Sequence, residues 1–176
     1  MYSAWGKYTS FVMLDEDAPG PGETPTQEFE VTVMLKDPLP KADYQKLRMR
    51  PYREDRKTID GADFPTTHLI VMSERAVDAL EGLISNDGIF YPLDVCGVDE
   101  KYWMFHVTRV IDCIDESVCE GALNRYAPEK SKFLALSKFF LDKKMIDPAV
   151  NVFKDGRYGN MYKFVSEKFY LTVKKK

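Results

Sequence analysis

One short pattern occurs twice in this sequence and constrains the fold more than any other feature. Residues 69–75 (LIVMSER) and 162–168 (YKFVSEK) each join an apolar, β-prone run to a Ser-Glu pair. A serine at such a junction can cap a helix, and the glutamate after it lies where the helix dipole favours negative charge. We therefore predict two strand–Ser-Glu–helix units, with Ser73 and Ser166 as the helix N-caps.

Both units should continue as helices. Behind the first copy, apolar residues recur with a period of 3.6, at Ala76, Val77, Leu80, Leu83 and Ile84. This pattern predicts an amphipathic helix that ends at the Asn-Asp-Gly sequence of residues 86–88. Residues 169–173 are β-prone by composition. We predict a helix there by analogy with the first copy.

The middle of the chain is typical of a β-hairpin. Residues 89–95 and 102–112 are rich in β-prone side chains, and residues 97–101 between them suit a loop. Pro92 lacks an amide hydrogen, which predicts that it lies at a sheet edge or a bulge. A short helix is predicted for residues 117–125.

The N-terminal third has weaker patterns. A short strand is predicted at residues 11–14, followed by a loop at 15–27 that is rich in acidic residues, Pro and Gly. Residues 28–35 alternate in polarity, as a half-buried strand does. Residues 41–50 are compatible with a short helix that Pro51 ends.

The fold class follows from length and composition. A chain of 176 residues with 44% hydrophobic residues can bury one substantial core, but is short for two independent ones. We predict a single α+β domain over residues 1–176, with a mixed or antiparallel sheet and a few helices. Residues 1–66 form its β-rich N-terminal part, and residues 67–176 carry the more diagnostic motifs.

Composition also restricts the setting of the protein. No stretch approaches the ~20 apolar residues of a membrane span, and the N-terminus lacks a secretion signal. Three cysteines fit reduced thiols better than a disulfide framework, so we expect a cytoplasmic protein that does not bind membranes. The net charge of −3 argues against general nucleic-acid binding.

Catalytic patterns are weak. Cys96, His106 and Asp94 could form a thiol–imidazole–carboxylate set if adjacent strands brought them together. Against this, no nucleophile elbow surrounds Cys96, and buried cysteine is common. An enzyme that uses Cys96 and His106 remains an alternative hypothesis.

No cofactor or metal is predicted. Cys113 and Cys119 lack a CxxC pairing, and His68 and His106 are isolated in the sequence, whereas structural zinc needs four close ligands. No glycine-rich loop has the spacing that binds phosphate.

Acidic residues are concentrated in one part of the chain. Residues 94–120 contain seven acidic side chains and two basic ones. Such a segment can be a solvated face, or it can be a docking surface for a basic partner. The candidate docking residues are Asp94, Asp99, Glu100, Asp112, Asp115 and Glu116.

The order of several short motifs resembles that of a known family. The motifs are IVMSER at 70–75, IFYPL at 89–93, YWMFHV at 102–107, VIDCID at 110–115, VFK at 152–154 and FVSEK at 164–168. In this order they resemble the immunity protein 11 family of bacterial polymorphic toxin systems, over residues 69–173. The resemblance implies a cytosolic, non-catalytic protein that neutralises a cognate toxin. If the acidic segment is the docking surface, the toxin should present a basic surface. A self-associating structural protein that uses its aromatic-rich strands is a third hypothesis.

Overall fold

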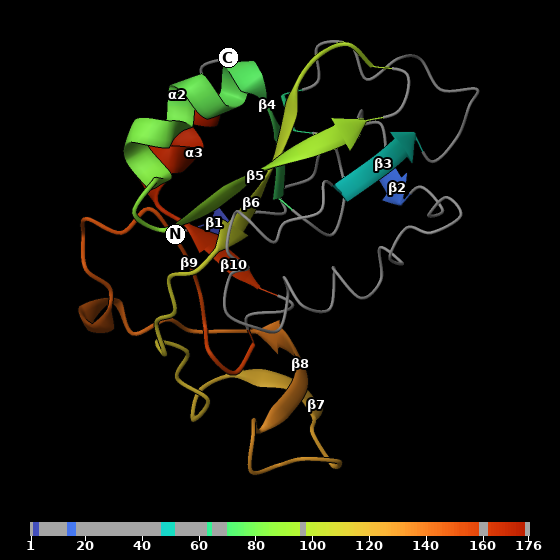
Figure 1. Cartoon of the computed structure of the whole chain (residues 1–176). Helices are drawn as coiled ribbons and strands as arrows, with labels where there is room; N and C mark the ends of the chain where they lie inside the picture. The colour runs from blue at the N-terminus through green and yellow to red at the C-terminus, as the bar shows by residue number, and fades with distance from the viewer. Residues whose placement is uncertain are drawn as a thin grey trace.

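The computed structural model describes residues 2–3, 14–16, 47–51, 63–64, 70–95, 98–158 and 162–174. For residues 2–3, 14–16 and 47–51 the structure describes the backbone, and the side chain of Met49 alone. The described elements form an α+β fold with two helices on one side and a separate two-stranded ribbon at the far end (Figure 1). The predicted fold class is confirmed.

A five-stranded sheet forms the centre of the fold. Its strand order is β2 (Leu14–Glu16), β3 (Leu47–Pro51), β5 (Gly88–Val95), β6 (Tyr102–Val107) and β4 (Ile70–Ser73). The β3–β5 pair is parallel and the other pairs are antiparallel, so the sheet is mixed. The predicted hairpin is the β5–β6 pair.

The first strand–Ser-Glu–helix unit is confirmed. β4 ends at Ser73, whose hydroxyl oxygen accepts a hydrogen bond from the Ala76 amide at 3.1 Å, and helix α2 (Glu74–Ile84) follows. The helix buries the apolar face that the sequence period predicted, consisting of Ala76, Val77, Leu80 and Ile84. These side chains pack on Phe105 and Val107 of β6.

The second unit has the same construction. Strand β10 (Lys163–Val165) is followed by helix α3 (Glu167–Lys174), and the Ser166 hydroxyl oxygen accepts from the Phe169 amide at 3.1 Å. Helix α3 lies beside α2 (Figure 1), and its Phe169 and Val173 pack against the same core. The two units therefore pack together on one side of the fold.

A small sheet separates this core from a second one. It has the strand order β1 (Tyr2–Ser3), β10, β9 (Val152–Lys154). Because side chains alternate along a strand, the Val152–Val165 pair faces the α2 core and the Phe153–Phe164 pair faces away. The phenylalanine rings stack at 5.2 Å in the second core.

The second core supports the two-stranded ribbon of β7 (Glu120–Leu123) and β8 (Phe133–Lys138). Phe133 and Leu136 of β8 are buried in it together with the two cysteines, Cys113 and Cys119. A short 3-10 helix, η2 (Lys143–Met145), lies between the ribbon and β9. The ribbon forms the lower end of the molecule in Figure 1.

Two predicted helices are wrong. Residues 47–50 of the predicted helix 41–50 lie in strand β3, where main-chain pairing with β2 and β5 outweighs helix propensity. Residues 41–46 lie outside the described residues. The predicted helix 117–125 is a turn followed by β7, in which Gly121 is a poor helix former and pairs with Leu136.

Two predicted boundaries need correction. The predicted loop 15–27 begins inside β2, and the predicted strand 102–112 ends at Val107, where the next two amides turn to the Asp87 carbonyl. Strand β5 is interior in the strand order and pairs with β6 at Pro92, but its described pairing with β3 does not reach Pro92, so the predicted edge position is not contradicted. Pro92 lies just before the β5 residues that pair with β3, which begin at Leu93. The predicted strand 28–35 lies outside the described residues.

Candidate functional site

The structure divides the predicted docking residues into two groups. Asp94, Asp99 and Glu100 lie before β6, at the β5–β6 connection, whereas Asp112, Asp115 and Glu116 follow it. Strand β6 has six residues and spans ~17 Å at the usual rise of a strand. The six acidic side chains therefore belong to two regions beyond opposite ends of this strand.

The first group lies around the hairpin. Asp94 is in β5, at the register position of Arg48 in β3, and is partly exposed. Asp99 is exposed. The Glu100 carboxylate accepts a hydrogen bond from the Tyr102 hydroxyl at 3.1 Å. Opposite charge is close to this group, since Lys101 forms an ion pair with Glu74 at 3.0 Å.

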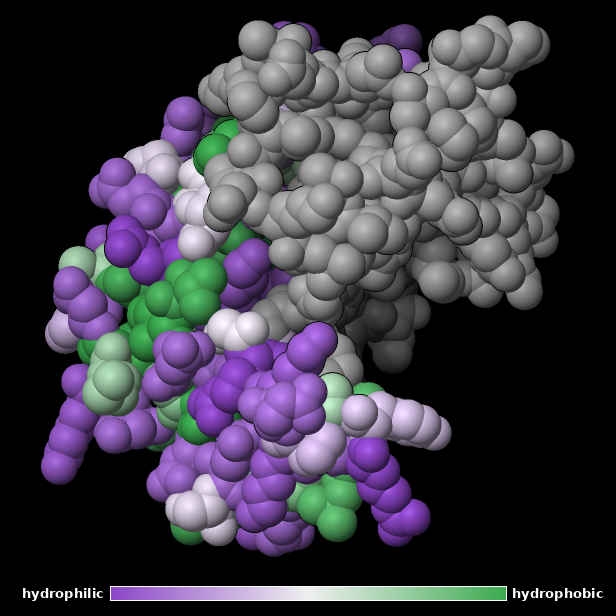
Figure 2. Space-filling view, turned by 60° about the horizontal axis from the view of Figure 1, so that its bottom comes forward, coloured by the Kyte–Doolittle hydropathy of each residue, from purple (hydrophilic) through white to green (hydrophobic). Residues whose placement is uncertain are grey.

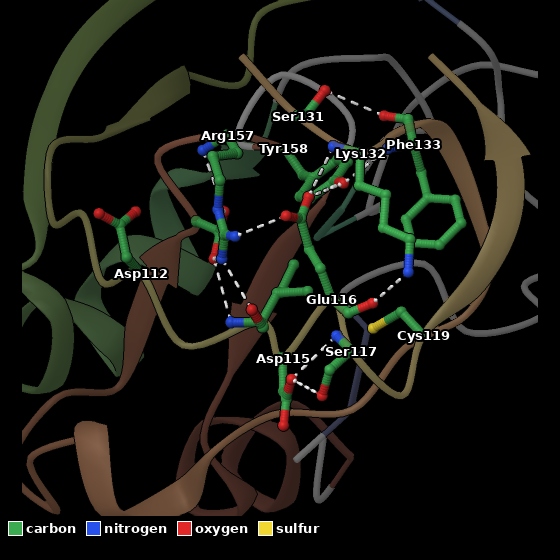
Figure 3. Close-up of polar contacts among 12 residues, drawn as sticks. Asp112, Asp115, Glu116, Ser117, Cys119, Ser131, Lys132, Phe133, Arg157 and Tyr158 are labelled. Atoms are coloured by element: carbon green, nitrogen blue, oxygen red, sulfur yellow. Dashed lines mark hydrogen bonds and ion pairs between the residues drawn. The ribbon is translucent and has the colours of Figure 1, made fainter. Parts of the chain in front are cut away.

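Glu116 in the second group is held by three neighbours (Figure 3). Its carboxylate accepts a short hydrogen bond from the Tyr158 hydroxyl and another from the Lys132 amide at 3.0 Å. Arg157 Nη1 lies 3.1 Å from Glu116 Oε2. These contacts connect the chain before β7 to the start of β8 and to the turn after β9.

Electrostatics agrees with this arrangement. Burial raises the pKa of Glu116, but the hydrogen bonds from Tyr158 and Lys132 and the charge of Arg157 outweigh it and hold the pKa below its usual value. Burial, followed by the neighbouring Glu116, raises the pKa of Tyr158 to about 12. Glu116 is thus ionised and Tyr158 is a neutral donor at physiological pH.

A buried carboxylate extends the network. Asp155 is fully buried, and its side chain accepts from the Ile114 amide at 3.2 Å and the Arg157 amide at 3.0 Å. Arg157 donates in turn to the Ile114 carbonyl at 2.7 Å. The network around Glu116 therefore acts as a structural connection, and its carboxylate is already satisfied.

Asp112 and Asp115 are different, because both are exposed and neither forms an ion pair with a described residue. Asp115 accepts from the Ser117 amide at 3.0 Å and the Ser117 hydroxyl at 2.6 Å, and these bonds lower its pKa. Asp112 accepts from the Gly156 amide at 3.0 Å. In Figure 3 Asp112 lies to the left of Arg157, and Asp115 lies below the Glu116 network beside Ser117.

Burial shifts the pKa of two groups that were considered for catalysis or metal binding. His106 is buried, and burial followed by Lys154 and Lys163 lowers its pKa to about 4. Burial also raises the pKa of the Cys113 thiol to about 11. Among the described residues, no group of three or more potential ligands could hold a metal. Cys96 and His68 lie outside the described residues.

Two features of this region have no signal in the sequence. Glu116 contacts Arg157 and Tyr158, and Tyr158 is 42 residues further along the chain. No local sequence pattern predicts contacts over such a separation. The ribbon also exposes apolar side chains, which the charge count did not consider: Leu123, Tyr126 and Leu134 are all exposed. Figure 2 shows hydrophobic side chains among hydrophilic ones on the face that includes this end.

Comparison with protein-family models gives a match to the immunity protein family Imm11 over residues 11–176, nearly the whole chain. The chain belongs to the Imm11 family. This confirms the family predicted from the ordered motifs, and the match extends well beyond the segment that they covered. Comparison with curated proteins gives no match. Imm11 membership suggests a role in immunity to a toxin.

None of the described helices is long and apolar enough to cross a membrane.

Proposed function

We propose that this Imm11 chain neutralises a cognate toxin by binding it directly and without catalysis. The observation that carries this proposal is the family match over residues 11–176. The state of His106 supports the non-catalytic part, because a buried imidazole with a pKa of about 4 is a weak base at neutral pH. The setting that we propose is the bacterial cytoplasm.

The acidic residues after β6 are the better docking candidates. Asp112 and Asp115 are exposed carboxylates that form no ion pair with a described residue. A toxin that attacks nucleic acid needs a basic surface, and complementary charge accelerates association with such a surface. Glu116 is engaged with Arg157 and Tyr158, so its replacement would damage the fold.

Two charge-matched double variants test this location. Asp112→Asn with Asp115→Asn removes two charges while an amide oxygen remains as acceptor for the Gly156 and Ser117 amides. Asp99→Asn with Glu100→Gln removes two charges at the hairpin and keeps an acceptor for Tyr102. Both variants have the same net charge, so general electrostatic effects on the toxin are equal.

The measurement is the association rate with the purified toxin encoded beside this chain's gene, at low and high salt. We expect the Asp112/Asp115 variant to associate several-fold more slowly at low salt, with a flatter salt dependence. The hairpin variant should change little. If both variants retain the wild-type rate at every salt concentration, the acidic docking surface is refuted, although direct binding stands.

A further inference from the structure

The two outer edges of the β7–β8 ribbon differ in the hydrogen bonds that their main-chain groups form in the described structure. On β8, the Tyr162 hydroxyl accepts from the Leu136 amide at 3.0 Å and donates to the Leu136 carbonyl at 2.9 Å. The Phe133 amide donates to the Tyr158 hydroxyl at 3.2 Å. These tyrosines satisfy the main-chain groups that face away from β7, so the β8 edge is closed.

The bonds on β8 also fix the direction of the groups on β7. In an antiparallel pair, opposite residues either bond to each other or both point outward. Leu136 and Phe133 point outward to the tyrosines, and their register partners on β7 are Gly121 and Leu123, although the register shifts between Glu120 and Gly121 and between Ala122 and Leu123. We infer that the main-chain groups of Gly121 and Leu123 point outward on the other edge. The Asn124 amide bonds inward to the Lys132 carbonyl at 3.0 Å, which agrees with this alternation.

Among the described residues, none pairs with the outer edge of β7. Apart from pairing with β8, Glu120–Leu123 make no main-chain hydrogen bond in the described structure. β7 contains no lysine or proline, two residue types that commonly protect natural edge strands, but it is only four residues long and its pairing with β8 has two register shifts. The Leu123 side chain shares a face with buried Phe133 but is 58% exposed, and Tyr126 beyond it is 91% exposed.

The acidic side chains near β7 favour a basic partner. Residues 112–123 contain four acidic side chains and no Lys or Arg. Glu116 is paired with Arg157, and Glu120 is paired with Lys138 at 3.2 Å. Asp112 lies in the field of Arg157, so the charge of Asp115 is the one that we expect to face a basic partner that approaches β7.

We propose that the outer edge of β7 accepts an extended segment of the toxin as a third strand of the β7–β8 ribbon. This inference rests on the proposed function and names the contact through which binding occurs. Main-chain hydrogen bonds to Gly121 and Leu123 would provide affinity, as in other complexes formed by strand addition. An apolar side chain of the added strand would cover Leu123, and a Lys or Arg near its end would face Asp115.

Amide exchange followed by NMR in the wild-type protein is the first test, since it needs no substitution. In the free protein, the Gly121 and Leu123 amides should exchange quickly because they lack a partner, whereas the Asn124 amide is already bonded. Addition of the purified toxin from the neighbouring gene should slow exchange at Gly121 and Leu123 by about tenfold or more.

Two variants at Leu123 distinguish the contribution of its main-chain amide to toxin binding from that of its side chain. Leu123→Pro removes an outward amide hydrogen without removing a bond to β8, a place where proline is tolerated in an edge strand. Leu123→Ala shortens the same side chain but keeps the amide. We expect Leu123→Pro to weaken toxin binding about tenfold more than Leu123→Ala. Leu171→Ala, at an exposed leucine of α3, should not affect binding.

The outcomes distinguish this proposal from the proposed function. If the toxin binds with wild-type affinity to both Leu123 variants and leaves Gly121 and Leu123 unprotected, strand addition is refuted while direct neutralisation stands. If the toxin does not bind the wild-type protein, both proposals are refuted. A free protein that dimerises through β7, with slow Gly121 exchange before toxin is added, would also overturn the open edge.

Discussion

Single buried polar residues hold distant segments of this chain together. Asp87 Oδ2 accepts from the Asn151 amide at 2.8 Å and the Val152 amide at 3.0 Å. The Asn151 side chain donates to the Leu83 carbonyl at 3.0 Å and accepts from the Ser166 hydroxyl at 2.8 Å. Two residues thus connect the end of α2, the start of β9 and the N-terminus of α3.

His106 should make stability depend on pH. Burial, with Lys154 and Lys163, lowers its pKa from 6.5 to about 4 in the folded state. Below pH 6.5 the unfolded chain therefore binds a proton that the folded chain does not, so stability is lost as the pH falls toward 4. Between pH 7 and pH 5 the loss from this residue is about 2 kcal/mol.

The check is urea unfolding of the wild type and of His106→Leu at pH 7 and pH 5. Leucine occupies a similar buried volume and does not titrate, so the variant should lose about 2 kcal/mol less than the wild type over this range. Equal losses in the two proteins would show that His106 is not the titrating group.

Residue roles were predictable where the contact is local. Ser73 and Ser166 bond to amides three residues ahead, and the sequence contains both partners of each bond. Glu116 was predicted as a docking residue, but its partner Tyr158 is 42 residues away. Only the fold brings these two side chains together.

Among the secondary-structure elements, α2 was predictable from local sequence signals and β7 was not. Helix α2 has an N-cap and an apolar period in its own sequence, so its bounds follow from local signals. Strand β7 has the sequence Glu-Gly-Ala-Leu, without a β-branched residue. Its conformation depends on pairing with β8, where a Cβ on Gly121 would collide with the Ala135 carbonyl.

The closed edge of β8 leads to a prediction about Tyr162. Tyr162→Phe removes the hydroxyl that bonds both main-chain groups of Leu136, so the free energy of unfolding should fall by about 1–2 kcal/mol. Tyr126→Phe is the matched control, because that side chain is 91% exposed, and its effect should be within about 0.5 kcal/mol of zero. Urea unfolding at neutral pH measures both. Equal effects would mean that the hydroxyl of Tyr162 does not stabilise the ribbon.

At the scale of the molecule, β9 and β10 join two cores into one structure. Their valines face α2 and their phenylalanines face the ribbon, so the alternation of a short strand pair serves both sides. The α2 core is supported by the repeated Ser-Glu units. The second core holds the ribbon, together with Asp112, Asp115 and the open edge of β7, at one end of the molecule (Figure 1).

This arrangement explains why the acidic segment was predictable and its division was not. A count along residues 94–120 finds the charge, but β6 passes through the middle of that segment and separates its two ends. The division depends on the length and direction of the strand. The open edge of β7 likewise emerges only when the tyrosines on the other edge are seen.

We propose that this Imm11 chain neutralises its toxin by stoichiometric binding. The most direct measurement titrates a fixed amount of the purified toxin from the neighbouring gene with increasing amounts of this protein, and follows the remaining toxin activity. We predict that activity falls linearly and reaches zero at a fixed molar ratio, at concentrations well above Kd, without covalent change in the toxin's mass. Complete inactivation by a small fraction of that ratio, or full activity in excess of this protein, would contradict the account.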